Sequence, residues 1–241
     1  MPSSKSKVSA KVPTLTSQKM ARMIDHTNLR PEASREQIMR LCEEAQEYGF
    51  GAVIVNPGYV ALACSRLSGS QTNVGAVIGF PLGATLTRVK EFEAREVLRL
   101  GAREIDMVMN IGALKSEDRR LVALDISAVA EVTHEYDGLL KVILETALLS
   151  DIEKVAACEI SVEAGADFVK TCTGFLGGTA TVADVALMRR TVGAEIGVKA
   201  SGGIRTASDA IAMIQAGANR IGTSSGVSIS REMRESTKGK K

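Results

Sequence analysis

Eight short apolar runs alternate with longer amphipathic stretches along the chain, and this repeat limits the possible folds more than any other feature. Runs rich in Val and Ile, separated by helix-like stretches, are typical of parallel strands joined by helices. Eight such units in 241 residues match the size of a single (β/α)8 TIM barrel, with an open doubly wound sheet as the alternative. The expected strands span residues 20–27, 51–56, 73–80, 104–110, 139–146, 168–175, 197–203 and 220–226.

Polar residues at the start of several amphipathic stretches indicate where helices begin. A Ser or Thr followed three residues later by an acidic residue or Gln can form a capping box, in which each side chain accepts a hydrogen bond from the other residue's backbone N–H. Three stretches have this spacing: Ser34 with Gln37, Ser150 with Glu153, and Thr206 with Asp209.

The composition fits a buried parallel sheet better than a nucleic-acid or membrane surface. Hydrophobic residues make up 45% of the chain but aromatic residues only 3%, so Ile, Val, Leu, Ala and Met must fill the core. The net charge is +2 and no basic stripe with stacking aromatics is present, so we expect no nucleic-acid partner. No apolar run approaches the roughly 20 residues of a membrane span, so we expect no membrane partner either.

The first residues and the cysteines indicate a cytoplasmic protein. The chain begins without the apolar segment of a secretory signal peptide. Its 4 cysteines form no CxxC pair, so reduced thiols are the expected state. No linker interrupts the repeat. We therefore expect one barrel domain over residues 18–236, with a flexible tail at 1–17 and a basic tail at 237–241.

Two lysines stand inside strands where an apolar side chain is the rule. Lys170 follows Val169 in the sixth expected strand, and Lys199 follows Val198 in the seventh. Adjacent parallel strands lie about 4.8 Å apart, so two inward ammonium groups repel each other, and this repulsion, together with burial, lowers the pKa of one. A neutral amine near pH 7 is what a lysine needs to attack a carbonyl. The residues alone leave two interpretations open, a Schiff-base lysine or a structural Lys–Asp network inside the barrel.

Two acidic residues in strands are candidates for the same site. Asp106 lies between apolar neighbours in the fourth expected strand, where it can pair with Lys199 or move a proton directly or through water. Asp25 in the first strand can orient a lysine or a substrate hydroxyl. Lys141 in the fifth strand should lie deeper than the other lysines, as part of the charge network. We interpret His26 as a hydrogen-bonded structural residue.

Two glycine-rich segments follow the seventh and eighth strands, where barrels often bind phosphate. Backbone N–H groups at Gly202, Gly203 and Gly222 can surround a phosphate, and Ser224 and Ser225 can add hydroxyl donors. Either segment alone is weak evidence, since glycine turns are common. Together they predict a phosphorylated ligand.

Metal and redox cofactors find no support in the sequence. The chain has 2 histidines far apart and no HxH or cysteine cluster, so we expect no metal site. No GxGxxG follows the first strand, and no GxSxG elbow is present, so neither a dinucleotide enzyme nor a serine hydrolase is indicated. We expect no cofactor.

Several motifs together resemble those of the deoxyribose-phosphate aldolase family of Schiff-base aldolases. The similarity covers roughly residues 18 to 230, nearly the whole chain. The motifs are IDHTNL (24–29), VNP (55–57), VIGFPLG (77–83), EIDMVMNIGAL (104–114), KVILET (141–146), FVKTCTGF (168–175), VKASGGIR (198–205) and RIGTSSG (220–226).

The resemblance implies reversible cleavage of 2-deoxy-D-ribose 5-phosphate to D-glyceraldehyde 3-phosphate and acetaldehyde. It implies that Lys170 forms the Schiff base, Lys199 perturbs the pKa of Lys170, Asp106 takes part in proton transfer, and Asp25 supports the lysines. It also implies a homo-oligomer, with a dimer as the guess. The phosphate site that it implies consists of Gly174, Gly202, Gly203, Gly222, Ser224 and Ser225, with Arg205 close by.

Three positions depart from the pattern of some family members. Ile54 replaces a cysteine that is linked to inactivation by aldehyde, so better aldehyde tolerance is expected. Phe175 replaces a lysine, so the phosphate site should depend more on backbone groups and Arg205. The chain ends in KGKK (238–241) in place of a tyrosine that assists catalysis.

Two rival functions remain compatible with the same barrel. A phosphosugar isomerase or cyclase would use Asp25 and Asp106 as acid and base. A binding or scaffold protein would hold the phosphosugar without turnover. The two strand lysines, Lys170 and Lys199, argue against the second.

Overall fold

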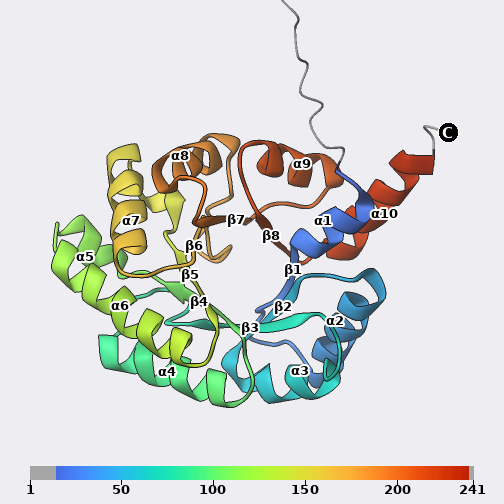
Figure 1. Cartoon of the computed structure of the whole chain (residues 1–241), viewed down its shortest axis with the longest axis horizontal. Helices are drawn as coiled ribbons and strands as arrows, with labels where there is room; N and C mark the ends of the chain where they lie inside the picture. Colours follow the sequence, from blue (N-terminus) through green and yellow to red (C-terminus); the bar gives the residue numbers. More distant parts are fainter. Residues whose placement is uncertain (1–14, 239–241) are drawn as a thin grey trace, which may run out of the picture.

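The chain folds into a closed barrel of eight parallel strands in sequence order, β1 to β8 (Figure 1). The computed structural model describes residues 15–238. The barrel predicted from the repeat is confirmed, because β8 pairs with β1 and leaves no open sheet edge. The strands are β1 (Ile24–Asn28), β2 (Ala52–Val55), β3 (Asn73–Ile78), β4 (Glu104–Val108), β5 (Leu139–Ile143), β6 (Phe168–Lys170), β7 (Gly197–Ser201) and β8 (Arg220–Thr223).

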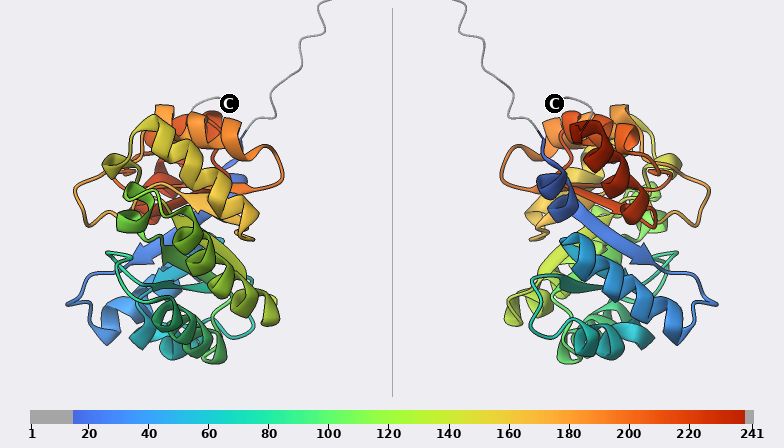
Figure 2. Two further views of the ribbon diagram at one scale, coloured as in Figure 1. Left: turned by 90° about the vertical axis from the view of Figure 1, so that its left-hand side faces the viewer. Right: turned by 90° about the vertical axis from the view of Figure 1, so that its right-hand side faces the viewer.

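Helices surround the barrel, and the side views in Figure 2 show this outer ring. One main helix follows each strand, while α1 precedes β1 and packs against α10, and α5 is an extra turn after β4. The helices are α1 (Ser17–Met23), α2 (Arg35–Tyr48), α3 (Val60–Arg66), α4 (Thr87–Arg99), α5 (Ile111–Lys115), α6 (Arg119–Glu135), α7 (Asp151–Glu163), α8 (Val182–Val192), α9 (Ala207–Gln215) and α10 (Gly226–Lys238), with 3-10 turns η1 (Pro57–Tyr59) and η2 (Thr146–Leu148).

The start of the first expected strand was wrong, because residues 20–23 belong to α1 and the strand begins only at Ile24. The Thr16 side chain accepts a hydrogen bond from the N–H of Lys19 and caps this helix. Met20, Ala21 and Ile24 are all buried, a spacing that suits a helix as well as a strand.

The three expected capping boxes are present. Ser34 with Gln37, Ser150 with Glu153, and Thr206 with Asp209 each exchange both hydrogen bonds at the start of a helix. Because these caps fix where α2, α7 and α9 begin, they also set the lengths of the loops that follow β1, β5 and β7.

The tails expected at 1–17 and 237–241 fall largely outside the described residues. Within them, α1 already begins at Ser17 and α10 runs to Lys238. Across the described part of the chain, no helix combines the length and the apolar character needed to cross a membrane. Cys42, Cys64, Cys158 and Cys172 are free.

The inside of the barrel is divided into an apolar half and a charged half. Paired residues of neighbouring strands face the same side of a sheet. Ala52 pairs with Asp25, and Val77 pairs with Asp106. Both acids contact Lys199 on β7, which is not a neighbour of either strand. Ala52, Val77 and Ile54 form an apolar cluster of their own with Leu29, separate from the large core between sheet and helices. The remaining strands supply the charged half.

Candidate active site

The two strand lysines point to the same place, as predicted. Lys170 on β6 and Lys199 on β7 are register partners in adjacent strands. Their Nζ atoms both donate to Oδ2 of Asp106 on β4, each over 2.7 Å. One carboxylate oxygen therefore bridges two amines and gives a direct path for a proton between them.

Asp106 is fully buried and is held as a carboxylate by three lysines. Its second oxygen, Oδ1, accepts a hydrogen bond of 2.9 Å from Nζ of Lys141. Burial opposes ionisation of the carboxyl, but the charges of Lys141, Lys170 and Lys199 outweigh it and hold the pKa of Asp106 well below its usual range.

Lys170 has a pKa below that of an ordinary lysine. Burial lowers its pKa from 10.5 to about 8, assisted by the like charge of Lys199 and opposed by Asp106. The direction agrees with the prediction from the sequence, although burial contributes more than the neighbouring lysine. The buried Lys–Asp network, one of the two interpretations left open by the sequence, is present and includes Lys170. The Schiff base on Lys170 stays a prediction.

The deeper part of the network joins Asp25 and Lys141. Asp25 forms ion pairs with Lys199 and with Arg220, whose Nε donates to Oδ1 over 2.7 Å. Burial opposes ionisation of Asp25, but the charges of Lys199, Arg220 and Lys141 keep its pKa below the usual value. Lys141 is fully buried, and its carboxylate neighbours outweigh the cost of burial and raise its pKa. It lies in the network as expected and not in the cavity.

Sequence reasoning missed two members of this network, Glu104 and Arg220. Glu104 Oε2 lies 2.5 Å from Lys141 Nζ and 3.1 Å from Arg220 Nη2. A signal was present, because Glu104 stands two residues before Asp106 and strand side chains alternate between faces. Together, the charge cluster consists of Asp25, Glu104, Asp106, Lys141, Lys170, Lys199 and Arg220.

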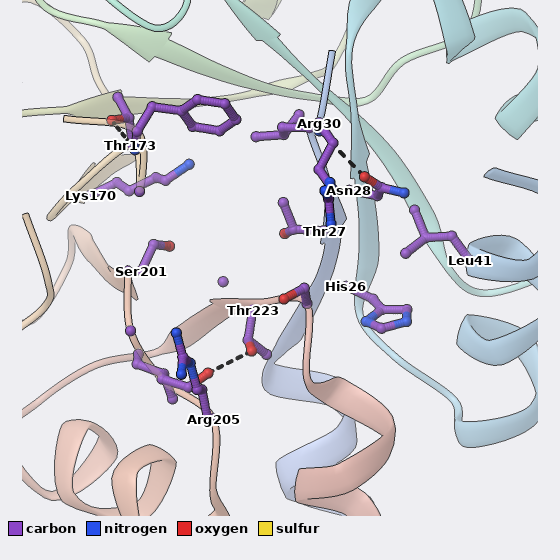
Figure 3. Close-up of a pocket in the computed structure, with 18 of the residues that line it drawn as sticks. His26, Thr27, Asn28, Arg30, Leu41, Lys170, Thr173, Ser201, Arg205 and Thr223 are labelled. Atoms are coloured by element: carbon purple, nitrogen blue, oxygen red, sulfur yellow. Dashed lines mark hydrogen bonds between the residues drawn. The ribbon is translucent and has the colours of Figure 1, made fainter. Parts of the chain in front are cut away.

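A cavity of about 560 Å³ opens above the cluster at the C-terminal ends of the strands. Lys170 is the single cluster residue that lines it, although the side chain is only 4% exposed. Figure 3 shows Lys170 pointing into the cavity between Thr173 and Ser201, with Arg205 and Thr223 at the other end. The other cluster residues do not line the cavity.

The end of the cavity away from Lys170 is formed by the loops after β7 and β8. Gly202, Gly203, Arg205 and Ser224 of these loops line the cavity, and Gly222 of β8 and Gly174 of the loop after β6 line it as well. Gly202 and Gly203 have φ of 103° and 76°, a left-handed backbone that glycine adopts without strain.

The glycine at position 222 has a further role. A Cβ there would lie 2.1 Å from Oγ of Ser201 and 3.0 Å from Cε of Lys199. The missing side chain therefore leaves room for Lys199, which is a constraint that the sequence did not reveal.

Ser225 is the one predicted binding residue that the structure does not bring into this cavity. It lines a neighbouring hollow with Glu44 and Arg231. Its backbone N–H donates to Oγ1 of Thr223, and α10 begins at the next residue. The chain has therefore already turned away from the cavity at this position.

His26 is buried and hydrogen-bonded, as expected. Its Nε2 lies 2.8 Å from Oε2 of Glu44 on α2. The ring also lines the edge of the cavity, which the sequence did not indicate.

The loop that carries Thr173 is held by a buried carboxylate. Glu145 Oε2 accepts hydrogen bonds from the backbone N–H and from Oγ1 of Thr173. Thr173 Oγ1 in turn accepts from the N–H of Phe175. Glu145 adopts a left-handed φ of 56°, which costs backbone energy in a non-glycine residue. The strained residue fixes the loop beside the reactive amine.

Comparison with known proteins identifies the family. Residues 19–233 match the model of the DeoC/LacD family aldolases. The chain belongs to this aldolase family. A deoxyribose-phosphate aldolase from Listeria monocytogenes is 57% identical over 210 residues, which is 87% of this chain and 94% of that protein. The one from Thermococcus gammatolerans is 60% identical over 212 residues, with the same coverage. The tetrameric deoxyribose phosphate aldolase from Aeropyrum pernix has a TM-score of 0.85 at 34% identity, covering 91% of this chain and 92% of that one.

Within this aldolase, Phe175 gives the cavity an aromatic wall. Its ring is 45% exposed, lines the cavity and meets Phe80 edge-on, with ring centroids 5.1 Å apart. Phe80 packs on the apolar half of the barrel interior. The cavity therefore has a polar end at Arg205 and an apolar edge near Phe175.

Proposed function

We propose that this aldolase reversibly cleaves 2-deoxy-D-ribose 5-phosphate to D-glyceraldehyde 3-phosphate and acetaldehyde through a Schiff base on Lys170. One observation carries the assignment of the nucleophile. Of the cations in the charge cluster, Lys170 alone lines the cavity, and burial lowers its pKa to about 8. A buried amine of low pKa that opens onto a cavity is suited to attack a carbonyl carbon.

The reaction follows from an amine that acts as an electron sink. Neutral Lys170 adds to C1 of the open-chain sugar, and loss of water gives an iminium. Removal of the C3 hydroxyl proton forms the aldehyde of D-glyceraldehyde 3-phosphate as the C2–C3 bond breaks. The bond electrons pass to the iminium nitrogen and leave an enamine. Protonation of C2 and hydrolysis then release acetaldehyde and restore Lys170.

Asp106 and Lys199 supply the proton transfers in this proposal. Asp106 Oδ2 lies 2.7 Å from both Lys170 and Lys199, so it passes protons between the two amines with little movement. Asp106 acts on the C3 hydroxyl through a water, because the carboxylate itself does not line the cavity. Asp25 holds Lys199 in place through their ion pair.

The phosphate is assigned to the polar end of the cavity. Gly202, Gly203 and Arg205 lie there, on the loop after β7. Backbone N–H groups and a guanidinium are ordinary phosphate donors. Phe175 adds no charge to the cavity, so the site depends on these groups. Gly174, Gly222 and Ser224 complete the proposed phosphate site.

Borohydride trapping tests both the chemistry and the nucleophile. Incubation with acetaldehyde and borohydride should add one ethyl group to Lys170, located by peptide mass spectrometry. Lys170→Leu should lose the adduct and nearly all cleavage activity, whereas Lys115→Leu, a change at a surface lysine, should keep both. An adduct on another lysine, or activity retained in Lys170→Leu, contradicts the assignment.

We also propose that the chain is cytoplasmic and forms a homo-oligomer. The four free thiols support a reducing compartment. An apolar stretch along the loop after β3 and α4 supports self-association, with Leu82, Leu86 and Phe92 exposed by 58%, 58% and 65%. The relative from Aeropyrum pernix is tetrameric, while the expected dimer stays a prediction. Light scattering of the purified protein decides the state.

A further inference from the structure

Arg220 and Glu104 are among the cluster residues that have no part in the reaction as described. Arg220 and Glu104 are the first residues of β8 and β4, so they lie toward the N-terminal ends of the strands, below the other charges. Neither lines the cavity. Arg220 Nη2 lies 3.1 Å and 3.2 Å from the two Glu104 oxygens, and its Nε bonds Asp25. They touch the substrate at no point, so any effect on catalysis must pass through the other cluster residues.

The cluster has one more cationic group than it has acids. Four basic groups, Lys141, Lys170, Lys199 and Arg220, face three carboxyls, Asp25, Glu104 and Asp106. A net charge in a buried, low-dielectric region is unfavourable, and loss of a single proton brings the cluster to neutrality. Arginine does not give up its proton in proteins. The proton must therefore come from one of the lysines.

The number of carboxylate partners decides which lysine gives up its proton. Lys141 has three within 4 Å, namely Glu104 at 2.5 Å, Asp106 at 2.9 Å and Asp25 at 3.7 Å. Lys199 has two, Asp25 and Asp106. Lys170 has Asp106 as its one carboxylate partner among the described residues. The amine that opens onto the cavity is thus the one whose ammonium form is held least.

We propose that Arg220 is a positioning residue that sets the protonation of Lys170. Arg220 adds a permanent cation, so the cluster carries one excess positive charge while all three lysines are protonated. Glu104 acts with the opposite sign. The inference rests on the proposed role of Lys170 as the nucleophile. The inward residues of β2 and β3 include the uncharged Ala52, Ile54 and Val77. The charged groups around Lys170 are Asp106 and Glu104 from β4, Lys141 from β5, Lys199 from β7, Arg220 from β8 and Asp25 from β1. His26, Arg30, Arg40, Glu44 and Arg205 line the same cavity, and the buried Glu145 bonds Thr173 beside Lys170.

The test is the pH profile of imine formation, measured as the initial rate of borohydride-trapped acetaldehyde adduct on Lys170. Arg220→Met removes the extra cation, so the cluster becomes neutral with every lysine protonated. The acid limb is the part of the profile in which the rate rises with pH as Lys170 loses its proton. This limb should move to higher pH, by on the order of one unit. Glu104→Gln removes a carboxylate, leaves the cluster further short of negative charge, and should move the limb to lower pH by a similar amount.

Matched variants separate the charge from the shape. Arg220→Lys keeps the cation, so its limb should stay near that of the unchanged protein even if it is less stable. Arg95→Met makes the same change at a surface ion pair with Glu91 and Glu135 and should not move the limb. A merely structural role would lower the adduct yield at every pH without moving the limb.

A shift to higher pH in Arg220→Met together with a shift to lower pH in Glu104→Gln supports the proposal, and the reverse pair of shifts contradicts it. Shifts in the same direction, or no shift in either, overturn it. If Arg220→Met does not fold, Glu104→Gln decides alone, because only a downward shift agrees with the charge count. Failure of the proposed function is seen separately, since the adduct of the unchanged protein would then map to a residue other than Lys170.

Discussion

Replacing Lys170 with Met should make the protein more stable while abolishing its activity. Met keeps the unbranched chain but carries no charge, and Lys170 is charged and buried at neutral pH. Folding lowers the pKa of this lysine from 10.5 to about 8, so its proton is held less tightly in the folded state. The cost is fully present below pH 8 and fades as the pH rises toward 10.5.

The size of the effect follows from this pKa change. At pH 7 the folded state is penalised by about 3 kcal/mol, since one pKa unit corresponds to about 1.4 kcal/mol. At pH 9.5 Lys170 is already mostly neutral in the folded state, so the folded state gives up a proton that the unfolded chain holds only weakly, and the penalty falls to about 1 kcal/mol. Lys170→Met should therefore exceed the unchanged protein in unfolding free energy by these amounts.

Urea unfolding followed by circular dichroism at both pH values measures the gap. Lys115→Met is the matched control, because Lys115 pairs with Glu153 at the surface and its side chain is 45% exposed. That change should alter stability by less than about 0.5 kcal/mol at either pH. A less stable Lys170→Met at pH 7, or a gap that does not change with pH, would refute the reasoning.

Three further changes test other parts of the structure. Gly222→Ala should lower kcat about tenfold or more, because the new methyl group overlaps Ser201 beside the reactive lysines, which steady-state assays will show. Asp125→Ala should lower the free energy of unfolding by about 3–5 kcal/mol, measured by urea unfolding, because it leaves the fully buried Lys90 ammonium without its carboxylate partner. Ile54→Cys should shorten the half-life of activity in acetaldehyde, because it places a thiol inside the barrel at a position that now carries an inert side chain.

Much of the barrel could be predicted from the sequence, because parallel strands buried on both faces appear in the sequence as a repeat of apolar runs. The same argument placed Lys170 and Lys199 side by side, since consecutive strands of such a barrel are neighbours. The start of the first strand was not predictable, because the buried spacing of Met20, Ala21 and Ile24 fits either element and the cap at Thr16 decides.

The deeper half of the charge cluster was harder to see, because its contacts join distant parts of the chain. Arg220 meets Asp25 across 195 positions and Glu104 across 116. Which residue of a strand faces which across the barrel depends on strand stagger, and this is set by packing of the whole ring. For Ser225, the onset of α10 decided that the residue leaves the cavity, and no cap motif marked that helix in the sequence.

The pairing of the last strand with the first has a consequence for how this enzyme acquires its activity. Asp25 belongs to the earliest strand, and Arg220 to the final one, and they bond each other where the ring is sealed. A nascent chain that still lacks its last strand holds Asp25 and Glu104 without their guanidinium. The charge balance that we propose for Lys170 is therefore complete only once the ring is sealed.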